Sequence, residues 1–334
     1  MLGIEHPVIQ DGMGPFNTVK LAAAVSNAGG LGSVSMPTLV GDPADGARQL
    51  TAHIEEAAGL TDKPFAVNVG VGIEKATGEP LAVSEAMVDA AVAAATANEA
   101  VGGKLKVLIT SGGFPGAFVD RVRGAGLVHI HKVGSTRQAE KVAAAGISAV
   151  IASGFEMGGH THMQPVHTFV LVPNVTEALD IPVILSGGAR DGRTLAAALA
   201  LGAEAIAMGT RFIVTEENDW HPAYKQRILD AVEGEDTLFP AWFSQARGLK
   251  GPGIDRLLAQ VDSGELQGKE LQDWKNEALT VAQRDGDIEK GIVAAGQVSS
   301  AIKDEVAISE FVPGICRDAA EILASLQSDR TVRP

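Results

Sequence analysis

The chain of 334 residues is long enough for one large or two smaller domains with a full hydrophobic core. A hydrophobic share of 46% with 39 glycines and only 4% aromatic residues is typical of an alanine- and valine-rich α/β protein. The net charge of −14 argues against nucleic acid and anionic membranes as partners, because no basic stripe is present to follow phosphates. Without a secretory signal or a long apolar run, the chain is expected to be cytoplasmic. The single cysteine, Cys316, excludes an internal disulfide and is expected to be a structural thiol in a helix.

Short apolar runs recur along the chain, and each is followed by an alanine-rich segment with helical spacing. The runs predicted to be strands are Pro7–Gln10, Leu31–Ser35, Phe65–Val71, Lys106–Thr110, Leu127–Lys132, Ala149–Ser153, Pro182–Ser186 and Ala205–Met208. The helices predicted between them are Thr18–Asn27, Pro43–Ala57, Ser84–Thr96, Ala117–Arg123, Thr136–Ala145, Val175–Leu179 and Arg193–Leu201. Because strands that alternate with helices form parallel sheets with right-handed crossovers, this order predicts an α/β fold closed into a TIM-type (β/α)8 barrel.

Several of the predicted helices end in a glycine that leads into the next strand. The glycines are Gly29, Gly146 and Gly202, and we expect each to take the left-handed conformation that ends a helix. Ser135 followed by Gln138 predicts a capping box at the start of the helix before the sixth strand. These signals concern structure and carry no information about substrate.

After Phe212 the alternation of strands and helices stops. Residues 213–294 have helical patterns without a strong strand, which predicts a helical insertion or lid after the eighth strand. The barrel would then occupy residues 1–212. Residues 295–334 would return to it, with Asp318–Gln327 as its last outer helix.

The sixth predicted strand leads into the most distinctive stretch of the chain, Gly154-Phe-Glu-Met-Gly-Gly-His. Barrel enzymes keep their chemistry at the carboxyl ends of the strands, where this stretch would lie. Gly158 and Gly159 lack a Cβ and allow close approach of a flat ligand, and they deliver the imidazole of His160. A solvated loop histidine is the alternative interpretation.

The seventh and eighth predicted strands both end in glycine, at Ser186-Gly-Gly and Met208-Gly-Thr. Backbone N–H groups at such tips can form an anion cradle, and barrels commonly bind phosphate there. The candidate donors are Gly187, Gly188, Gly209 and Thr210. The alternative is that the paired glycines only make a tight turn. No Walker loop is present and no G-x-G-x-x-G follows the first strand, so a Rossmann domain is not expected.

Further candidate ligands stand at the tips of the first, third and fifth strands. They are Met13 between two glycines, the amide of Asn68 and the amine of Lys132. Because the carboxyl ends of barrel strands meet at one mouth, these groups would converge with the glycine-rich tips. A phosphate site, an amide, a lysine and glycines that permit close approach together suit a phosphorylated heterocycle such as FMN.

With these motifs the chain resembles the nitronate monooxygenase family, formerly called 2-nitropropane dioxygenases, and the related FMN-dependent enoyl-acyl-carrier-protein reductases. The resemblance runs over almost the whole chain, and Glu-x-Gly-Gly-His is its most diagnostic element. The motifs that carry it are Pro7-Val-Ile-Gln-Asp-Gly-Met, Ala22-Ala-Ala-Val-Ser-Asn-Ala-Gly-Gly-Leu-Gly, Pro64-Phe-Ala-Val-Asn, His131-Lys-Val, Gly154-Phe-Glu-Met-Gly-Gly-His, Ser186-Gly-Gly with Asp191-Gly, Met208-Gly-Thr-Arg-Phe and Ala295-Gly-Gln.

The resemblance implies FMN as cofactor and His160 as the active-site histidine beside the flavin. The positions implied to bind FMN are Gly12, Met13, Asn68, Lys132, Ser153, Gly159, Ser186, Gly187, Gly188, Met208, Gly209 and Thr210. Among these, Lys132 would lie near the polar edge of the flavin. Ser153 occupies a position that is often acidic in the monooxygenases.

The segment after His160 departs from the family pattern, since it places His162 and His167 near the mouth. A His-x-His pair can bind a metal, but a metal site would need further ligands and would compete with the flavin, so none is expected. The two extra histidines would shape the substrate site or lie in a loop. His129 and His131 point to the same side of the fifth strand and are expected to form a packed, hydrogen-bonded pair.

Two enzyme functions agree with these residues. The first is an FMN-dependent monooxygenase that oxidises a nitronate with O2 to a carbonyl compound and nitrite. The second is an FMN-dependent reductase or dehydrogenase of an acyl thioester, on CoA or acyl carrier protein, which would use NAD(P)H and need an open trough. A flavin-binding barrel without turnover is a third option, but it leaves His160 without a task. The tendency of such barrels to pair makes a homodimer one possible assembly.

Overall fold

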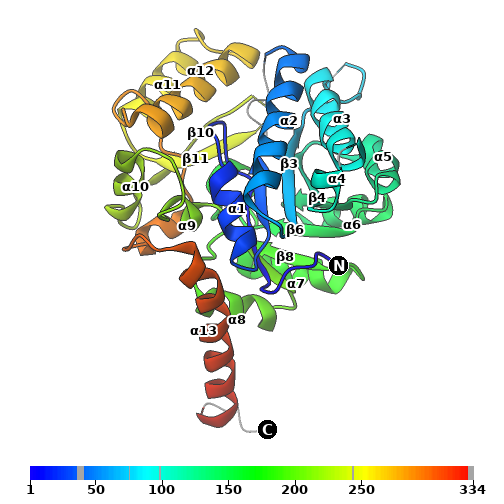
Figure 1. Ribbon diagram of the computed structural model, residues 1–334. Helices are drawn as coiled ribbons and strands as arrows, with labels where there is room; N and C mark the ends of the chain where they lie inside the picture. The colour runs from blue at the N-terminus through cyan, green and yellow to red at the C-terminus, as the bar shows by residue number, and fades with distance from the viewer. Residues whose placement is uncertain (36–40, 75, 98, 243, 330–334) are drawn as a thin grey trace.

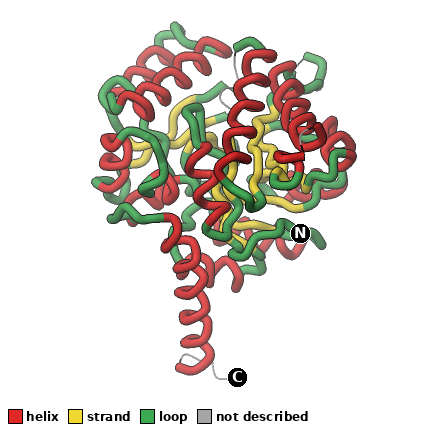
Figure 2. The backbone as a smooth tube through the Cα atoms, in the orientation of Figure 1, coloured by secondary structure: helices red, strands yellow, loops and turns green. Residues whose placement is uncertain are grey.

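The computed structural model describes residues 1–35, 41–74, 76–97, 99–242 and 244–329. Within these residues one sheet has eight parallel strands in the order β1-β9-β8-β6-β5-β4-β3-β2 (Figures 1 and 2). The strands are β1 (Val8–Gln10), β2 (Gly32–Ser35), β3 (Phe65–Val71), β4 (Leu105–Gly112), β5 (Val128–Val133), β6 (Ala149–Ser153), β8 (Val183–Ser186) and β9 (Ala205–Met208). A parallel bridge between Ile9 and Leu31 joins β1 to β2 and closes the barrel. The predicted TIM barrel is confirmed, and each predicted strand is found.

The inside of the barrel is filled by one of the two side-chain sets that alternate along each strand. On β6, Ala149 and Ile151 point inward, whereas Val150 and Ala152 pack outward against the helices. The inward set also contains Ile9, Leu31, Ala66, Val107, Ile109, Ile130, Ile184, Ala205 and Ala207. Because every strand is buried on both faces, the strands appear in the sequence as continuous apolar runs.

The helices that follow the strands cover the outside of the barrel (Figure 1). They are α1 (Val19–Asn27), α2 (Pro43–Leu60), α3 (Ala82–Ala97), α4 (Glu99–Gly102), α5 (Val119–Gly124), α6 (Thr136–Ala144), α7 (Thr168–Ala178), α8 (Gly192–Ala200) and α13 (Ile308–Asp329), with a 3₁₀ turn at Gly116–Phe118. Two predicted helices were too short. α7 begins at Thr168 instead of Val175, and α13 begins at Ile308 instead of Asp318. Each contains an internal proline, which is why the sequence pattern placed the start of the helix after it.

The predicted helix ends agree with the structure. Gly29, Gly146 and Gly202 have φ angles of 86°, 94° and 89°, which only glycine adopts without strain. Ser135 caps α6, because its hydroxyl accepts the N–H of Gln138 at 3.3 Å. The predicted capping box is only half formed, because Oε1 of Gln138 accepts the N–H of Gly134 and not that of Ser135.

The insertion lies between β9 and α13 and contains a β-hairpin as well as helices. Its helical elements are α9 (Thr210–Ile213), α10 (Pro222–Leu229), α11 (Pro252–Asp262), α12 (Gly268–Thr280), a π-helical turn (Val281–Asp285) and a 3₁₀ turn (Gln297–Ala301). The hairpin strands β10 (Asp236–Pro240) and β11 (Gln245–Leu249) form a separate three-stranded antiparallel sheet with β7 (Gly159–Thr161). The predicted helical insertion after the eighth strand is therefore present, but the sequence pattern missed its β-hairpin. Each hairpin strand mixes apolar with charged or proline residues, so neither had a strand pattern.

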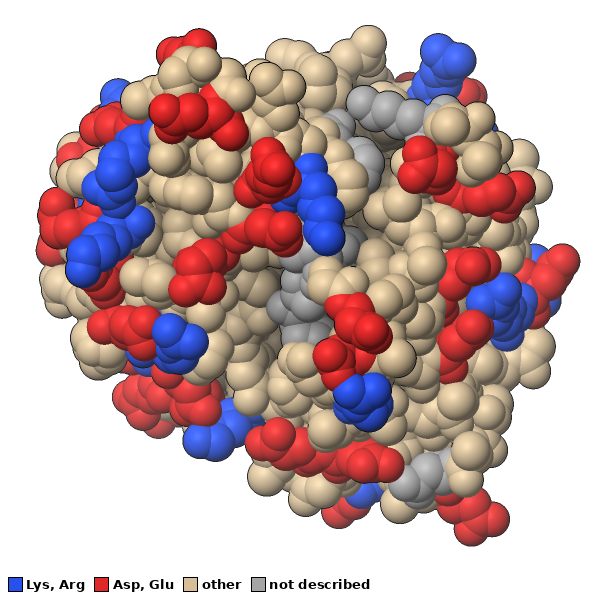
Figure 3. Space-filling model, turned by 90° about the horizontal axis from the view of Figure 1, so that it is seen from above, with Lys and Arg blue, Asp and Glu red and all other residues tan. Residues whose placement is uncertain are grey.

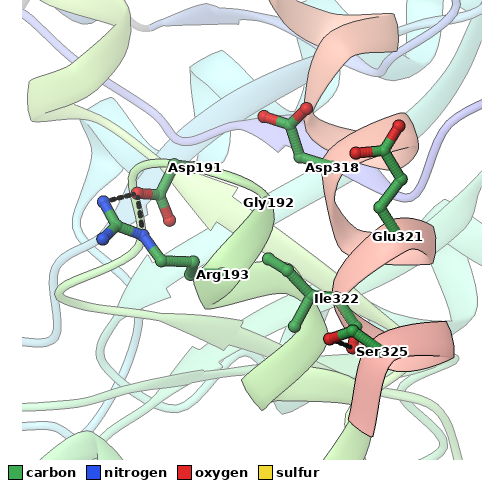
Figure 4. Close-up of a pocket in the computed structure, with 7 residues that line it drawn as sticks. All are labelled: Asp191, Gly192, Arg193, Asp318, Glu321, Ile322 and Ser325. Atoms are coloured by element: carbon green, nitrogen blue, oxygen red, sulfur yellow. Dashed lines mark hydrogen bonds and ion pairs between the residues drawn. The ribbon is translucent and has the colours of Figure 1, made fainter. Parts of the chain in front are cut away.

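α13 is the last outer helix, and it packs against α8 and α1 before its end projects from the body (Figure 1). Asp318 and Glu321 on α13 face the start of α8, where Asp191 accepts a hydrogen bond from Thr194 N–H and pairs with Arg193 (Figure 4). Cys316 is half-buried in α13, and burial raises the pKa of its thiol. Among the described residues, no helix has the length and apolar character needed to cross a membrane.

Candidate active site

A cavity of about 700 Å³ lies at the carboxyl ends of the strands, which is where barrel enzymes place their active sites. Its walls combine the strand tips with residues of α10, α12 and β10 from the insertion. The predicted site residues that line it are Gly12, Met13, Asn68, Lys132, Gly159, His160, Ser186, Gly187, Gly188, Met208, Gly209 and Thr210. Ser153 does not line the cavity: its side chain is fully buried, and its hydroxyl has no partner among the described residues.

The tips of β1, β5 and β8 are tied together by the carboxylate of Asp11. One of its oxygens lies 2.7 Å from Lys132 Nζ and accepts the hydroxyl of Ser186 at 2.9 Å. Lys132 and Asp11 are both nearly buried, and their charges compensate each other. Asp11 was not among the predicted site residues. The available signal was its place directly after a buried strand, at the same barrel mouth as Lys132.

The first loop of the barrel is held close to the third strand. A Cβ on Gly12 would lie 2.3 Å from the side chain of Asn68, so only glycine fits at this position. Met13 N–H donates to Ser35 Oγ at 2.8 Å. From the π-helical turn of the insertion, Gln283 accepts Phe16 N–H at 3.1 Å and donates to Gly14 O at 3.1 Å. The insertion therefore fixes the loop that follows β1.

The tips of β8 and β9 offer unused backbone donors to the cavity. Gly187 and Gly188 have φ angles of 95° and 79°. Within the described part of the chain, the N–H groups of Gly188 and Gly209 take no part in the strand ladders, and both residues line the cavity. Gly187 lines it as well, but the register of Ser186 with Ala207 places its N–H in the ladder between β8 and β9. A Cβ on Gly188 would meet no atom closer than 4.0 Å. Unpaired N–H groups around open space form the cradle that a phosphate needs.

His160 belongs to β7 and not to a free loop. It lies opposite Ala246 of β11 in the antiparallel register, and its ring stays accessible from the cavity. Nε2 of His160 is 2.6 Å from Nζ of Lys275, a residue of α12 that is only 1% exposed. The Lys275 ammonium, then burial and Lys132, hold the pKa of His160 far below its ordinary value. The neutral imidazole is therefore the favoured form of His160 while Lys275 is charged.

The loop between β6 and β7 is fixed on both sides. A Cβ on Gly158 would lie 2.4 Å from the N atom of Gly296, so the late Ala295-Gly-Gln motif packs against the glycines before His160. Glu156 caps α7, because its carboxylate accepts both the backbone N–H and the hydroxyl of Thr168. Glu156 and the Ala295-Gly-Gln segment therefore hold the glycines that lead to His160 in place.

The other histidines near the mouth have different environments. His162 lines the cavity, packs on the backbone of Gly134, and has its pKa lowered to about 4 by burial and by Lys132. His167 is half-exposed at the start of α7, 3.4 Å from Glu156. Nε2 of His129 and Nδ1 of His131 are 2.9 and 2.8 Å from the Thr110 hydroxyl, which confirms the predicted pair. In the described chain, no three His, Cys, Asp or Glu side chains form a group that could hold a metal.

Sequence reasoning missed the cavity residues that the insertion contributes, and Lys275 and Gln283 are two of them. Both lie on amphipathic helical segments whose polar residues look solvent-exposed when the sequence is read alone. Together the site offers a donor cradle, a neutral imidazole and a buried ammonium around one space. Such a set can bind an anion at one place and polarise or protonate a negatively charged oxygen at another.

The family model described as nitronate monooxygenase matches residues 1–318. A Mycobacterium tuberculosis (strain ATCC 25618 / H37Rv) protein named (3aS,4S,5R,7aS)-5-hydroxy-7a-methyl-1-oxo-octahydro-1H-indene-4-carboxyl-CoA dehydrogenase is 34% identical, over 96% of this chain and 94% of that protein. A protein of Paraburkholderia phytofirmans (strain DSM 17436 / LMG 22146 / PsJN) named nitronate monooxygenase is 30% identical, over 98% of this chain and 93% of its own length.

Solved structures also resemble the chain over nearly its whole length. The structure of FabK from Thermotoga maritima superposes with a TM-score of 0.84 at 33% identity and covers 98% of this chain and 96% of that one. A nitroalkane oxidase from Streptomyces ansochromogenes shares the fold, with a TM-score of 0.79 at 24% identity and coverage of 97% and 98%. The family match extends from the first residue to α13 and includes every strand tip that lines the cavity. The chain therefore belongs to the nitronate monooxygenase family of oxidoreductases.

Proposed function

We propose that the protein is an FMN-dependent monooxygenase that oxidises alkyl nitronates with O2 to a carbonyl compound and nitrite. The observation that carries this proposal is the ammonium of Lys275, which is buried beside His160 at the cavity without a carboxylate partner among the described residues. A buried cation without a counterion favours an anionic ligand, because the ligand then compensates its charge. A nitronate is a small anion of this kind.

The residues present fit FMN. The N–H groups of Gly188 and Gly209, with Gly187 beside them, suit its phosphate. Gly12, Met13 and Asn68 would lie along the isoalloxazine and ribityl chain, with Lys132 near the polar edge of the ring. Ser186, Met208, Thr210 and Gly159 complete the proposed contacts at the cavity wall. When bound, FMN supplies the electron-transfer chemistry that no side chain of this site provides.

The chain's own residues bind and orient the substrate. His160, held neutral, and the ammonium of Lys275 would lie at the negatively charged oxygens of the nitronate. Phe239, Trp220 and Leu279 from the insertion contribute apolar surface to the same cavity and limit access of water to the reacting carbon.

The second candidate is an FMN-dependent reductase or dehydrogenase of an acyl thioester that uses NAD(P)H. It is favoured by the relative whose name ends in carboxyl-CoA dehydrogenase and by the similarity to FabK. It is also favoured by a cavity that extends to Ile73 and Gly113 at the tips of β3 and β4. Against it, the charged residues described along the cavity are Asp11, Lys132, Glu156 and Lys275. None of these cations is free at the mouth for the phosphates of CoA, and Figure 3 shows Lys and Arg scattered among acidic residues.

An anaerobic absorbance titration separates these candidates. The purified protein, supplied with FMN, is mixed with ethylnitronate or propionate 3-nitronate in one sample and with NADH or NADPH in another. Bleaching of the flavin band by a nitronate, followed by recovery and nitrite release in air, is the expected result. Bleaching only by a nicotinamide would replace this function with the thioester reductase. A protein that takes up no FMN would overturn both.

A further inference from the structure

Lys275 is a buried lysine of the insertion that contacts the active-site histidine of the barrel. It comes from α12 of the insertion, is 1% exposed, and reaches across to β7, where Nζ lies 2.6 Å from Nε2 of His160. No carboxylate among the described residues pairs with it. The acidic residues beside it on α12, Asp273 and Glu277, are exposed on the other side of the helix. Its hydrogen-bond partner in the described chain is therefore the imidazole.

The charged groups on the neighbouring elements are already engaged. Lys132 of β5, which acts on His160 through its charge, is paired with Asp11. On β11, Arg247 is paired with Asp236 and donates to Phe155 O. Because Lys132 and Arg247 are engaged in ion pairs, the two groups in direct contact that can exchange a proton beside β7 are Lys275 and His160.

Besides Glu156, which is engaged with Thr168 as the cap of α7, two further titratable groups line the same cavity. Tyr224 of α10 donates its hydroxyl to Ala294 O at 3.0 Å, and burial raises its pKa. His162 of the segment after β7 is kept neutral by burial. Neither group changes its charge near neutral pH, so neither supplies a second proton to Lys275 or His160.

The contact with Lys275 determines which ring nitrogen of His160 carries the proton. An ammonium has three donors and no acceptor, so Nε2 of His160 must accept from Lys275 while Lys275 is charged. In the neutral ring the proton is then on Nδ1, which has no partner among the described residues and is available to a ligand in the cavity. If Lys275 becomes a neutral amine, Nε2–H can donate to it, and Nδ1 becomes an acceptor.

We propose that Lys275 is a positioning residue that sets the hydrogen-bond polarity of His160 toward the substrate. With Lys275 charged, Nδ1–H donates to a negatively charged oxygen of the ligand. With Lys275 neutral, Nδ1 takes a proton from a carbon acid, Nε2 passes its own proton to the amine, and the carbanion stays on the substrate. Burial lowers the pKa of Lys275 to about 7, so both forms exist in the physiological range.

For the identity of the ligand this inference rests on the proposed function. It assigns two substrate forms to one site. Below neutral pH, His160 with Nδ1–H as donor would bind nitronate anions. Above neutral pH, His160 with Nδ1 as acceptor would deprotonate the parent nitroalkanes. The polarity of His160 itself does not depend on which substrate is correct.

The first test reads the imidazole directly. The protein is labelled with ¹⁵N-histidine, and the ring signals of His160, assigned by loss in His160→Gln, are followed from pH 5.5 to 9 without substrate. We expect the Nδ1–H tautomer at low pH and a change of tautomer with a midpoint near 7. In Lys275→Met this change should be lost, whereas Lys269→Met, an exposed lysine of the same helix, should keep it. A single tautomer over the whole range, or the same change in Lys275→Met, would overturn the inference.

The second test uses an arginine, which keeps the charge but does not lose its proton in this range. Lys275→Arg should retain turnover of ethylnitronate and lose the rise in nitroethane turnover above neutral pH. Lys275→Met should lower kcat/KM for ethylnitronate by about 10- to 100-fold, as for a lost hydrogen bond to a charged group. FMN affinity and the unfolding midpoint of each variant report whether it is folded.

Nitroethane turnover that still rises with pH in a folded Lys275→Arg variant would overturn the role of Lys275. Failure of the proposed function gives a different result: the tautomer change would be present, but neither nitro compound would bleach the flavin. The positioning of His160 would then hold for another substrate.

Discussion

His160 has Nε2 on Lys275 and its side chain lines the cavity, so its contribution should be to reaction and not to folding. His160→Asn removes the imidazole but leaves the glycine cradle and the Asp11–Lys132 pair intact. We expect the yellow FMN complex to form, with flavin reduction by substrate slowed by about 10²–10⁴-fold, the range for loss of an acid–base group. Stopped-flow reduction under anaerobic conditions measures this. Loss of FMN from the variant would instead make His160 a structural residue.

Gly188 should act on cofactor binding. It has φ of 79° and open space beside it, so Gly188→Val both strains the backbone and fills the proposed phosphate cradle. We expect FMN affinity to fall by about tenfold or more, equivalent to a cost above about 1.4 kcal/mol, measured by fluorescence titration. The matched control is Gly234→Val, which has φ of 80° and no neighbour within 4 Å outside the cavity. Equal loss of affinity in both variants would show strain alone and contradict the cradle.

Among single residues, the sequence identifies those that lie at the carboxyl end of a barrel strand. Met13, Asn68, Lys132 and His160 could be assigned because each follows a buried run and the carboxyl ends of parallel strands share one mouth. Lys275 could not, because a lysine on an amphipathic helix has the same pattern whether it faces solvent or reaches into a cavity. Ser153 is the opposite case. It ends a strand as predicted, but its side chain is fully buried and does not reach the cavity.

Among the elements, α7 depends on a cap supplied from another segment. Glu156 accepts from Thr168 N–H and hydroxyl, and no side chain at the preceding residue caps the helix. Glu156→Ala should therefore lower the free energy of unfolding by about 1–2 kcal/mol. Urea unfolding of the variant measures this. Glu177→Ala, an exposed glutamate on the same helix, is the control and should change stability by less than about 0.5 kcal/mol. A similar loss in both would rule out the capping role.

The barrel strands were predictable and the β10–β11 hairpin was not, for a physical reason. Each barrel strand is buried on both faces, so its own residues must be apolar wherever it lies. The hairpin is stabilised by the pairing of β11 with β7, for example of Ala246 with His160, which comes 86 residues earlier. Its own residues therefore need not have strand character. Arg247 in β11 illustrates this, since its buried guanidinium pairs with Asp236 on β10. Long-range pairing of this kind leaves no local pattern.

For the whole molecule, acid should reduce stability before the carboxylates titrate. Burial lowers the pKa of His129 to about 4, and burial with the charges of His129 and His162 lowers that of His131 to about 3. In the unfolded chain both would have pKa values of about 6.5. Between these values the unfolded chain binds more protons, so the free energy of unfolding rises with pH and falls as pH is lowered below about 6.5.

The measurement is urea unfolding at pH 7, 6 and 5. In His129→Gln one of these protons is removed, and the slope of stability against pH near pH 5 should decrease by about 1.4 kcal/mol per pH unit at most. An unchanged slope would mean that His129 is protonated in the folded protein, in conflict with its 2% exposure and its contact with Thr110.

The two hydrogen bonds of Gln283 with Phe16 and Gly14 join positions 267 and 269 residues apart. During synthesis, β1 can pair with β9 once residue 208 has left the ribosome, well before Gln283 is made. A nascent chain can therefore have a closed barrel while the loop after β1 still lacks its hydrogen bonds to Gln283 and the cavity lacks Lys275. Cofactor uptake would then follow completion of the insertion, so a chain truncated before it should remain colourless although its barrel strands are present.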